Sequence, residues 1–191
     1  MTKDIPPKSL KLSKTIVLVG LMGAGKTCIG MRLAARLGLP FVDADTEIER
    51  AAGCSVPDIF ELYGESEFRE GERRVIARLL KDSPHVLATG GGSFMDAATR
   101  QEIRDQAVSV WLRADLNLLV SRTGRRAGRP LLKNGDRRAI LEQLIEERHP
   151  IYAEADLVIE SARESPGITV DRLIDALKQF TGESVVAGAA Q

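Results

Sequence analysis

The sequence predicts a single α/β domain built on a parallel sheet with helices on both faces. Short apolar runs of strand length alternate with amphipathic stretches of helix length, and the chain shows no internal repeat. Its 191 residues suit one compact domain with a substantial core and leave little room for a second.

Five runs have the composition of strands that are covered on both faces. The first, TIVLVG, is uninterrupted and rich in β-branched residues. The predicted strands are residues 15–20, 40–45, 85–89, 108–112 and 157–160. The predicted helices are residues 26–37, 46–52, 56–62, 65–81, 96–105, 115–122 and 170–180.

The ends of the chain differ from the body in composition. Residues 1–13 are expected to form a flexible polar arm and residues 182–191 a flexible tail, so the folded domain is expected at 14–181. The arm has no apolar core or cleavage site of a secretory signal, and no run approaches the roughly 20 apolar residues that span a bilayer. Two cysteines, Cys28 and Cys54, lack metal-ligand spacing and are expected to be free thiols in a reducing cytoplasm.

The charge balance gives no sign of a nucleic-acid or membrane partner. Lys plus Arg and Asp plus Glu both number 27, so the formal net charge is +0. There is thus no global reason to expect nucleic-acid or membrane binding, and any anion site must be local.

The segment GLMGAGKT, residues 20–27, has the pattern of a phosphate-binding loop between a predicted strand and a predicted helix. Glycines let backbone N–H groups turn inward around phosphates, and the helix N-terminus faces the same anion. Lys26 reaches the β/γ oxygens, and the Thr27 hydroxyl is suited to Mg²⁺. We therefore expect a nucleoside triphosphate as ligand. The contacts expected here are Gly23, Ala24, Gly25, Lys26, Thr27 and Cys28.

Two further features fall at carboxyl ends of predicted strands, where such sheets bind ligands. Asp43 and Asp45 close the second strand and are expected on opposite sides of it, one near Mg²⁺ and the other facing an acceptor. Capping of the strand end is the alternative. Gly90, Gly91 and Gly92 follow the third strand, where three bare residues indicate that something comes close to the backbone.

Three arginine-containing segments have both an ordinary and a functional interpretation. Arg69 pairs with Glu72 at i+3 as any surface ion pair would, and Arg148 is a cation near a helix end. Residues 122–138 carry seven basic side chains and three glycines. A solvated loop is the simple reading of this segment, but a long basic loop inside a compact domain is more typical of a lid.

Taken together, these segments resemble the shikimate kinase family from about Ile16 to Phe180. The resemblance is carried by GLMGAGKT, FVDADTEIE, IFELYGESEFRE, GGGS, GRPLL and ERHPIYAEAD, in the family's order and spacing. It implies a P-loop three-layer α/β/α fold with strand order 2-3-1-4-5 and a mobile lid. It also implies phosphorylation of the 3-hydroxyl of shikimate by ATP with Mg²⁺, in the pathway to chorismate and aromatic amino acids. The protein is expected to be cytoplasmic and monomeric.

The resemblance also assigns residues by position. It places the shikimate hydroxyl on Asp45, magnesium on Thr27 and Asp43, and the shikimate carboxylate on Arg69 and Arg148. It assigns the glycine triplet Gly90–Gly92 to contact with the substrate, and Arg129 in the lid to contact with the phosphates. The expected catalytic residues are Lys26, Asp45 and Arg129, and the expected adenine contacts are Arg122, Arg163 and Pro166.

Two rival functions remain at this point. A gluconate or nucleoside-monophosphate kinase would share the fold, although a nucleotide acceptor needs a base pocket and phosphate-clamping arginines. A regulatory nucleotide-binding module would have lost the reactive residues, whereas Lys26, Thr27 and both aspartates are present.

Overall fold

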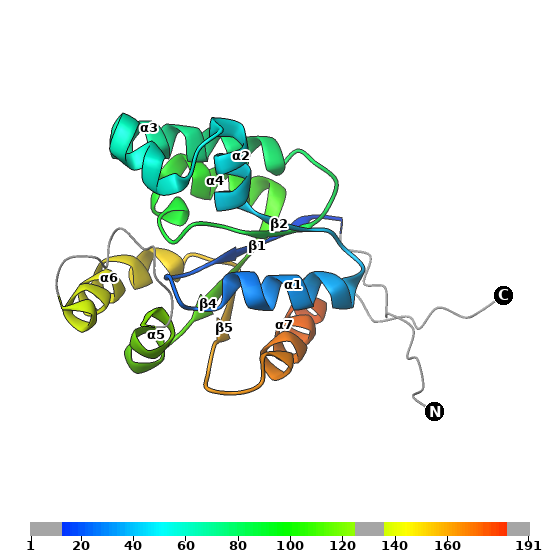
Figure 1. Ribbon diagram of the computed structural model, residues 1–191. Coiled ribbons are helices and arrows are strands. Elements are labelled where there is room, and N and C mark those ends of the chain that lie inside the picture. Colours follow the sequence, from blue (N-terminus) through cyan, green and yellow to red (C-terminus); the bar gives the residue numbers. More distant parts are fainter. Residues whose placement is uncertain (1–12, 125–135, 183–191) are drawn as a thin grey trace, which may run out of the picture.

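The computed structural model describes residues 13–124 and 136–182. The expectations for the arm, the tail and most of the lid, including Arg129, therefore lie outside the described residues. Five parallel strands form one sheet in the order β2-β3-β1-β4-β5 (Figure 1). They are β1 Thr15–Val19, β2 Phe41–Asp43, β3 Val86–Ala88, β4 Ala107–Arg113 and β5 Leu157–Glu160. The predicted fold class and strand order are confirmed.

Strand β1 is the centre of the sheet. It pairs with β3 on one side and β4 on the other, so that Val17 stands opposite both Leu87 and Ser109. All five of its residues are buried. Burial on both faces explains why the run is apolar throughout instead of alternating with polar residues.

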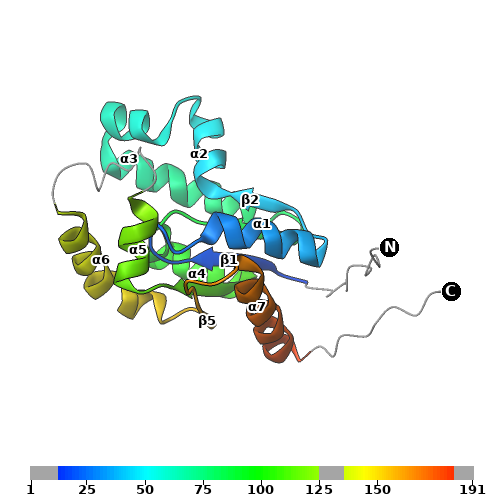
Figure 2. The ribbon, with the colours of Figure 1, turned by 60° about the horizontal axis from the view of Figure 1, so that its bottom comes forward.

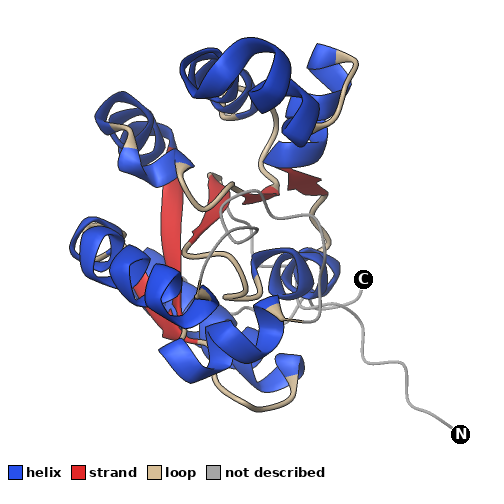
Figure 3. Ribbon diagram, turned by 60° about the vertical axis from the view of Figure 1, so that its left-hand side comes forward, coloured by secondary structure: helices blue, strands red, loops and turns tan. Residues whose placement is uncertain are grey.

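Helices cover both faces of this sheet, as Figure 3 shows. On one face α1 (Lys26–Leu37) packs against α7 (Pro166–Thr181). The other face carries α2 (Ala44–Ala52), α3 (Val56–Leu79), the 3₁₀ turn η1 (Ser93–Met95) and α4 (Ala97–Gln106). Two more helices, α5 (Leu116–Thr123) and α6 (Arg137–Tyr152), pack side by side (Figure 2). Within residues 13–124 and 136–182, no helix is long and apolar enough to cross a membrane.

Most element boundaries lie within two residues of the sequence prediction, and the differences at β2, α7 and α6 concern the surroundings of the site. Strand β2 ends at Asp43 instead of residue 45, because the Asp43 carboxylate accepts the Asp45 N–H and starts α2 there. Helix α7 starts at Pro166 instead of residue 170, since proline suits the first helical position. Only the end of a helix was expected near Arg148, whereas α6 has 16 residues and continues through Pro150.

The two helices predicted at 56–62 and 65–81 are the two halves of α3, separated by a kink at Gly64. Gly64 has φ 83° and ψ 173°, a conformation that is almost confined to glycine. The rings of Phe60 and Phe68 lie 4.5 Å apart across the kink. Because of the bend, the same helix places Val56 in the cleft at the carboxyl ends of the strands and Arg69 beside Gly92.

We expect Gly64→Ala to lower the free energy of unfolding by about 1–3 kcal/mol, because alanine is strained at this φ/ψ. Gly71→Ala is the matched control, since Gly71 lies in the same helix without a positive φ and an added Cβ meets nothing within 4 Å. It should stabilise by about 0.5–1 kcal/mol. Urea unfolding of both variants checks this, and equal effects would contradict the kink's dependence on glycine.

Candidate active site

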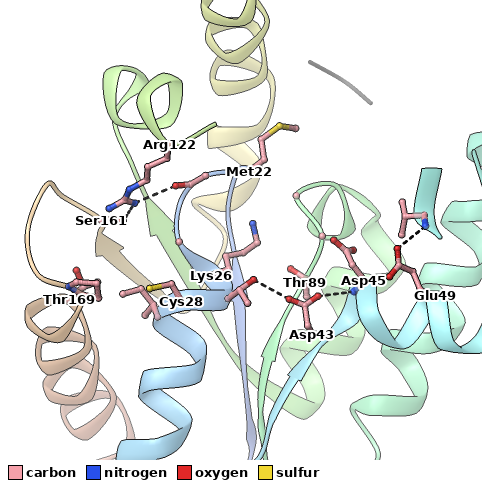
Figure 4. A pocket seen from close by; sticks show the side chains of 18 of the residues that line it. Met22, Lys26, Cys28, Asp43, Asp45, Glu49, Thr89, Arg122, Ser161 and Thr169 are labelled. Atoms are coloured by element: carbon pink, nitrogen blue, oxygen red, sulfur yellow. Dashed lines mark hydrogen bonds between the residues drawn. The ribbon is translucent and has the colours of Figure 1, made fainter. Parts of the chain in front are cut away.

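A cleft of about 750 Å³ lies at the carboxyl ends of β1, β2 and β3 (Figure 4). Because these strands are parallel, the segments that follow them meet at one edge of the sheet. Of the residues predicted from sequence, those lining it are Gly23, Gly25, Lys26, Thr27, Cys28, Asp43, Asp45, Gly90, Gly91, Arg122 and Pro166. Of the predicted residues that the structure describes, five do not line it: Ala24, Arg69, Gly92, Arg148 and Arg163.

The loop after β1 depends on glycine for its backbone path. Gly20, Gly23 and Gly25 have φ of 136°, 86° and 105°, values that side chains rarely permit. A Cβ on Gly20 would also lie 2.7 Å from the Leu112 carbonyl oxygen. Gly25 caps α1 without a side-chain hydrogen bond, so the first turn of the helix opens into the cleft. This is the geometry of an anion site at a helix N-terminus.

Lys26 folds back over this loop. Its Nζ donates to the Gly20 carbonyl at 2.7 Å and to the Leu21 carbonyl at 3.2 Å. Figure 4 shows the side chain rising into the cleft between the loop and Asp45. The ammonium group is therefore placed where phosphate oxygens held by the loop would meet it.

Thr27 and Asp43 form an oxygen pair at the base of the cleft. The Thr27 hydroxyl donates to Asp43 Oδ2 at 3.1 Å, and Asp43 Oδ1 accepts the Asp45 N–H. Among the described residues there is no group of three His, Cys, Asp or Glu that could hold a metal. Mg²⁺ bound with a nucleotide takes only one or two protein ligands, its others being phosphates and water. The pair fits such an ion.

Asp45 lies in the first turn of α2, so the prediction that Asp43 and Asp45 project from opposite sides of a strand was wrong. It is exposed along the open side of the cleft, and protein atoms enclose its carboxylate elsewhere. This partial burial and the charge of Asp43 raise the pKa of Asp45 to about 6, although Lys26 lowers it in part. The carboxylate is thus a better proton acceptor than an ordinary aspartate.

The glycine turn after β3 is crowded by charged side chains. A Cβ on Gly90 would lie 2.9 Å from Glu72 Oε1 and 3.1 Å from Asp45 Oδ1. A Cβ on Gly92 would lie 2.5 Å from Arg69 Nη1. A Cβ on Gly91 would make only ordinary contacts, so the protein's own atoms leave space at this middle glycine.

Arg69 is held at the turn by a buried carboxylate. Its Nη1 donates to Glu72 Oε2 at 2.8 Å, and the Ser93 hydroxyl donates to the other oxygen, Oε1, at 2.6 Å. Glu65 pairs with the outer side of the guanidinium at 3.2 Å. Glu72 is only 3% exposed, which is rare for a surface ion pair. The expected i+3 pair exists, and it places Arg69 beside the glycines. The contact of Arg69 with a substrate carboxylate stays a prediction.

Arg148 reaches the same turn from α6. Its Nη1 donates to the Gly91 carbonyl at 2.9 Å, and the Tyr152 hydroxyl donates to the same oxygen. Arg69 and Arg148, 79 positions apart in the chain, therefore contact adjacent glycines. Neither lines the cleft itself. Sequence reasoning missed Tyr152 and Ser93, although both belong to motifs that it quoted.

At the other end of the cleft, Arg122 holds the phosphate-binding loop. Its guanidinium donates to the carbonyls of Gly23, Ala24 and Ala162 and to the Ser161 hydroxyl, at 2.9–3.3 Å. Ala24, predicted as a contact, is buried behind the loop, and its carbonyl also accepts from Ser161. Pro166 lines the cleft, whereas Arg163 is exposed and does not. The adenine contacts stay predictions.

Comparisons with known proteins give the family. A protein-family model with the description "SKI: Shikimate kinase" matches residues 22–178. A shikimate kinase of Paramagnetospirillum magneticum is 59% identical over 172 residues, which cover 90% of this chain and 88% of the relative. The chain belongs to the shikimate kinase family. A shikimate kinase of Caulobacter vibrioides is 54% identical over 87% of this chain and 84% of its own length.

Solved structures of the shikimate kinase family agree. Shikimate kinase from Acinetobacter baumannii in complex with shikimate superposes with a TM-score of 0.88 and is 36% identical, over 93% of this chain and all of that one. A gluconokinase from Sinorhizobium meliloti gives a TM-score of 0.57 at 19% identity over 91% of this chain and 100% of the other, a likeness of fold alone. The resemblance noted from sequence is confirmed.

We expect Asp45→Asn to stabilise the fold above pH 6 and to have little effect near pH 4. Since its pKa is raised from 3.8 to about 6, the native state binds the Asp45 proton more tightly than the unfolded state does. The wild-type chain therefore loses stability as pH rises through this range, and the variant does not. The gain should be about 1 kcal/mol, because solvent in the open cleft screens the charge. Denaturant unfolding from pH 4 to 8 checks this, with Asp82→Asn on an exposed turn as control.

Proposed function

We propose that the chain transfers the γ-phosphoryl group of ATP to the 3-hydroxyl of shikimate, giving shikimate 3-phosphate and ADP. The observation that carries the proposal is the meeting of three groups around one glycine turn. Asp45, Arg69 and Arg148 all approach Gly90–Gly92, and this turn adjoins the phosphate-binding loop. A carboxylate that can accept a hydrogen bond from a hydroxyl and two arginines that can hold an acid are thus available beside a nucleotide site.

The nucleotide end would provide positioning and charge neutralisation, which are the main needs of phosphoryl transfer. The loop amides and the N-terminus of α1 would hold the phosphates, and Lys26 would face the β/γ oxygens. The Thr27 and Asp43 oxygens would hold Mg²⁺, which would neutralise phosphate charge when bound. Arg129 in the lid remains assigned to the phosphates by resemblance alone.

The acceptor end would orient the hydroxyl toward the donor. Asp45 lies between the loop and the glycine turn, with its carboxylate 3.1 Å from a Cβ position at Gly90. A carboxylate with a pKa of about 6 is ionised at neutral pH and accepts a hydrogen bond from the attacking hydroxyl. We assign Asp45 to this contact.

The two arginines would hold the carboxylate of the substrate. Arg69 is fixed by Glu72, and Arg148 is held near the same place by the Gly91 carbonyl. A guanidinium fork pairs a carboxylate through two hydrogen bonds, which gives direction as well as charge. The carboxylate of a sugar acid would pair with the same arginines. The shape of the cleft must therefore distinguish the ring of shikimate from a sugar acid.

The proposal extends to the protein's setting. Cys28 and Cys54 are both free and half-buried, in keeping with a reducing cytoplasm. We further propose that the enzyme works as a monomer, because one copy of the chain brings the nucleotide end and the acceptor end of the site together and needs no second copy to complete it.

Asp45→Asn should lower kcat by about 100-fold or more, because amide nitrogen and oxygen cannot accept the hydroxyl proton as a carboxylate does. The KM for ATP should change little. In the wild-type enzyme, kcat/KM for shikimate should fall as pH drops below about 6, since protonated Asp45 no longer accepts. A coupled assay of ADP release checks both, with Asp82→Asn as control. Full activity of the Asn variant would remove Asp45 from the reaction.

Wild-type enzyme with Mg²⁺ and ATP should phosphorylate shikimate and act very poorly on shikimate methyl ester and on gluconate. Loss of one member of a buried charge pair costs about 2–5 kcal/mol, so the ester should lose about 30-fold to several-thousand-fold in kcat/KM. Arg69→Ala should flatten this preference by weakening the acid more than the ester. Arg74→Ala, an exposed arginine of the same helix, is the control. Similar kcat/KM for acid and ester would contradict the arginine assignments.

A further inference from the structure

Tyr152 is a buried tyrosine that none of the roles above uses. It is the last residue of α6 and has 0% exposure. Its ring stacks on Trp111 and on Phe94, with centroids 5.8 Å and 6.3 Å away. Phe94 belongs to η1, directly after the glycine turn. Packing on both rings leaves the hydroxyl one fixed direction, toward Gly91.

The Gly91 carbonyl is the acceptor that Tyr152 shares with Arg148. A carbonyl oxygen has two lone pairs, and these two donors use both. The donors lie at i and i+4, so they project from one face of α6. Burial raises the pKa of Tyr152 to about 12, which keeps its hydroxyl protonated and able to donate at any working pH.

The two donors differ in what else they can do. Arg148 is half-buried and long, and the proposed reaction requires it to pair with the carboxylate of the substrate. Tyr152 is enclosed and cannot turn elsewhere. When the guanidinium moves toward a carboxylate, the Gly91 carbonyl keeps a partner only if the tyrosine hydroxyl is present. Gly91 is half-buried, so losing the last protein partner of its carbonyl is costly, and the glycine turn has no side chains to hold its shape.

We propose that Tyr152 is a positioning residue for the acid substrate: its hydroxyl holds the Gly91 carbonyl, which frees Arg148 to bind the carboxylate and keeps the glycine turn in place. This inference rests on the proposed function, because it assumes that Arg148 leaves the Gly91 carbonyl in order to bind the carboxylate of the substrate. The bond from Tyr152 to the carbonyl exists without that assumption.

Tyr152→Phe is the direct test, because it keeps the ring stacking and removes only the hydroxyl. The KM for shikimate should rise about tenfold, with the KM for ATP unchanged and kcat within about threefold. The melting temperature should fall little, since Arg148 still bonds the carbonyl in the free enzyme. Tyr63→Phe changes the other tyrosine, which is 62% exposed, and should leave all these values unchanged. A shikimate KM within twofold of wild type in Tyr152→Phe would overturn the proposal.

A second set of variants, made in the Arg148→Ala enzyme, separates a positioning role of Tyr152 from a packing role. With Arg148→Ala, the carbonyl depends on Tyr152 alone in both the free and the bound enzyme. Adding Tyr152→Phe should then lower the melting temperature clearly and leave the already raised shikimate KM unchanged. Equal melting temperatures of the single Arg148→Ala and the double variant would contradict the shared carbonyl. An inactive wild-type enzyme would contradict the proposed function instead, and the melting temperatures would still decide the shared carbonyl.

Discussion

The acceptor end of the site depends on one constraint, the close approach of bare backbone to charged side chains at Gly90–Gly92. The carboxylates of Asp45 and Glu72 and the guanidinium of Arg69 all lie within 3.1 Å of where a Cβ would stand on Gly90 or Gly92. Any side chain there would push these groups apart. The missing Cβ atoms are therefore what allows two carboxylates and a guanidinium to occupy the same small space.

The donor and acceptor ends are joined through backbone contact. A Cβ on Gly91 would lie 3.5 Å from the Met22 nitrogen and 3.7 Å from the Gly20 oxygen, so the glycine turn rests against the phosphate-binding loop. The pairing of β1 with β3 is the cause, because it brings the segments after both strands to one edge. A reaction between two bound molecules needs such adjacency, since proximity supplies much of the rate.

Local charge at the site contrasts with the neutral chain as a whole. The formal net charge is +0, yet the site gathers acidic and basic groups in alternation. Asp43 and Asp45 stand near Lys26, and Glu72 stands near Arg69. The neighbouring Asp43 charge and partial burial raise the pKa of Asp45, and the ion pair with Glu72 fixes Arg69 in place. Opposite charges thus lie close together both in the cleft and behind the glycine turn, which limits the net field around the site.

The sequence by itself determined the fold class, the five strands and the phosphate-binding loop, because burial on both faces and glycine spacing leave direct signatures in local residues. It also indicated the Gly64 kink, as two separate helices. Only the tertiary structure decided which residues meet at the glycine turn. Arg69, Gly91 and Arg148 come from three distant segments, and strand pairing and helix packing bring them together. The start of α2 at Ala44 is a local event, because Asp43 caps the helix by accepting the Asp45 N–H, and the strand interpretation of this run overlooked it. The donor role of Tyr152 depends on burial between two aromatic rings from distant segments, which a local sequence pattern does not record.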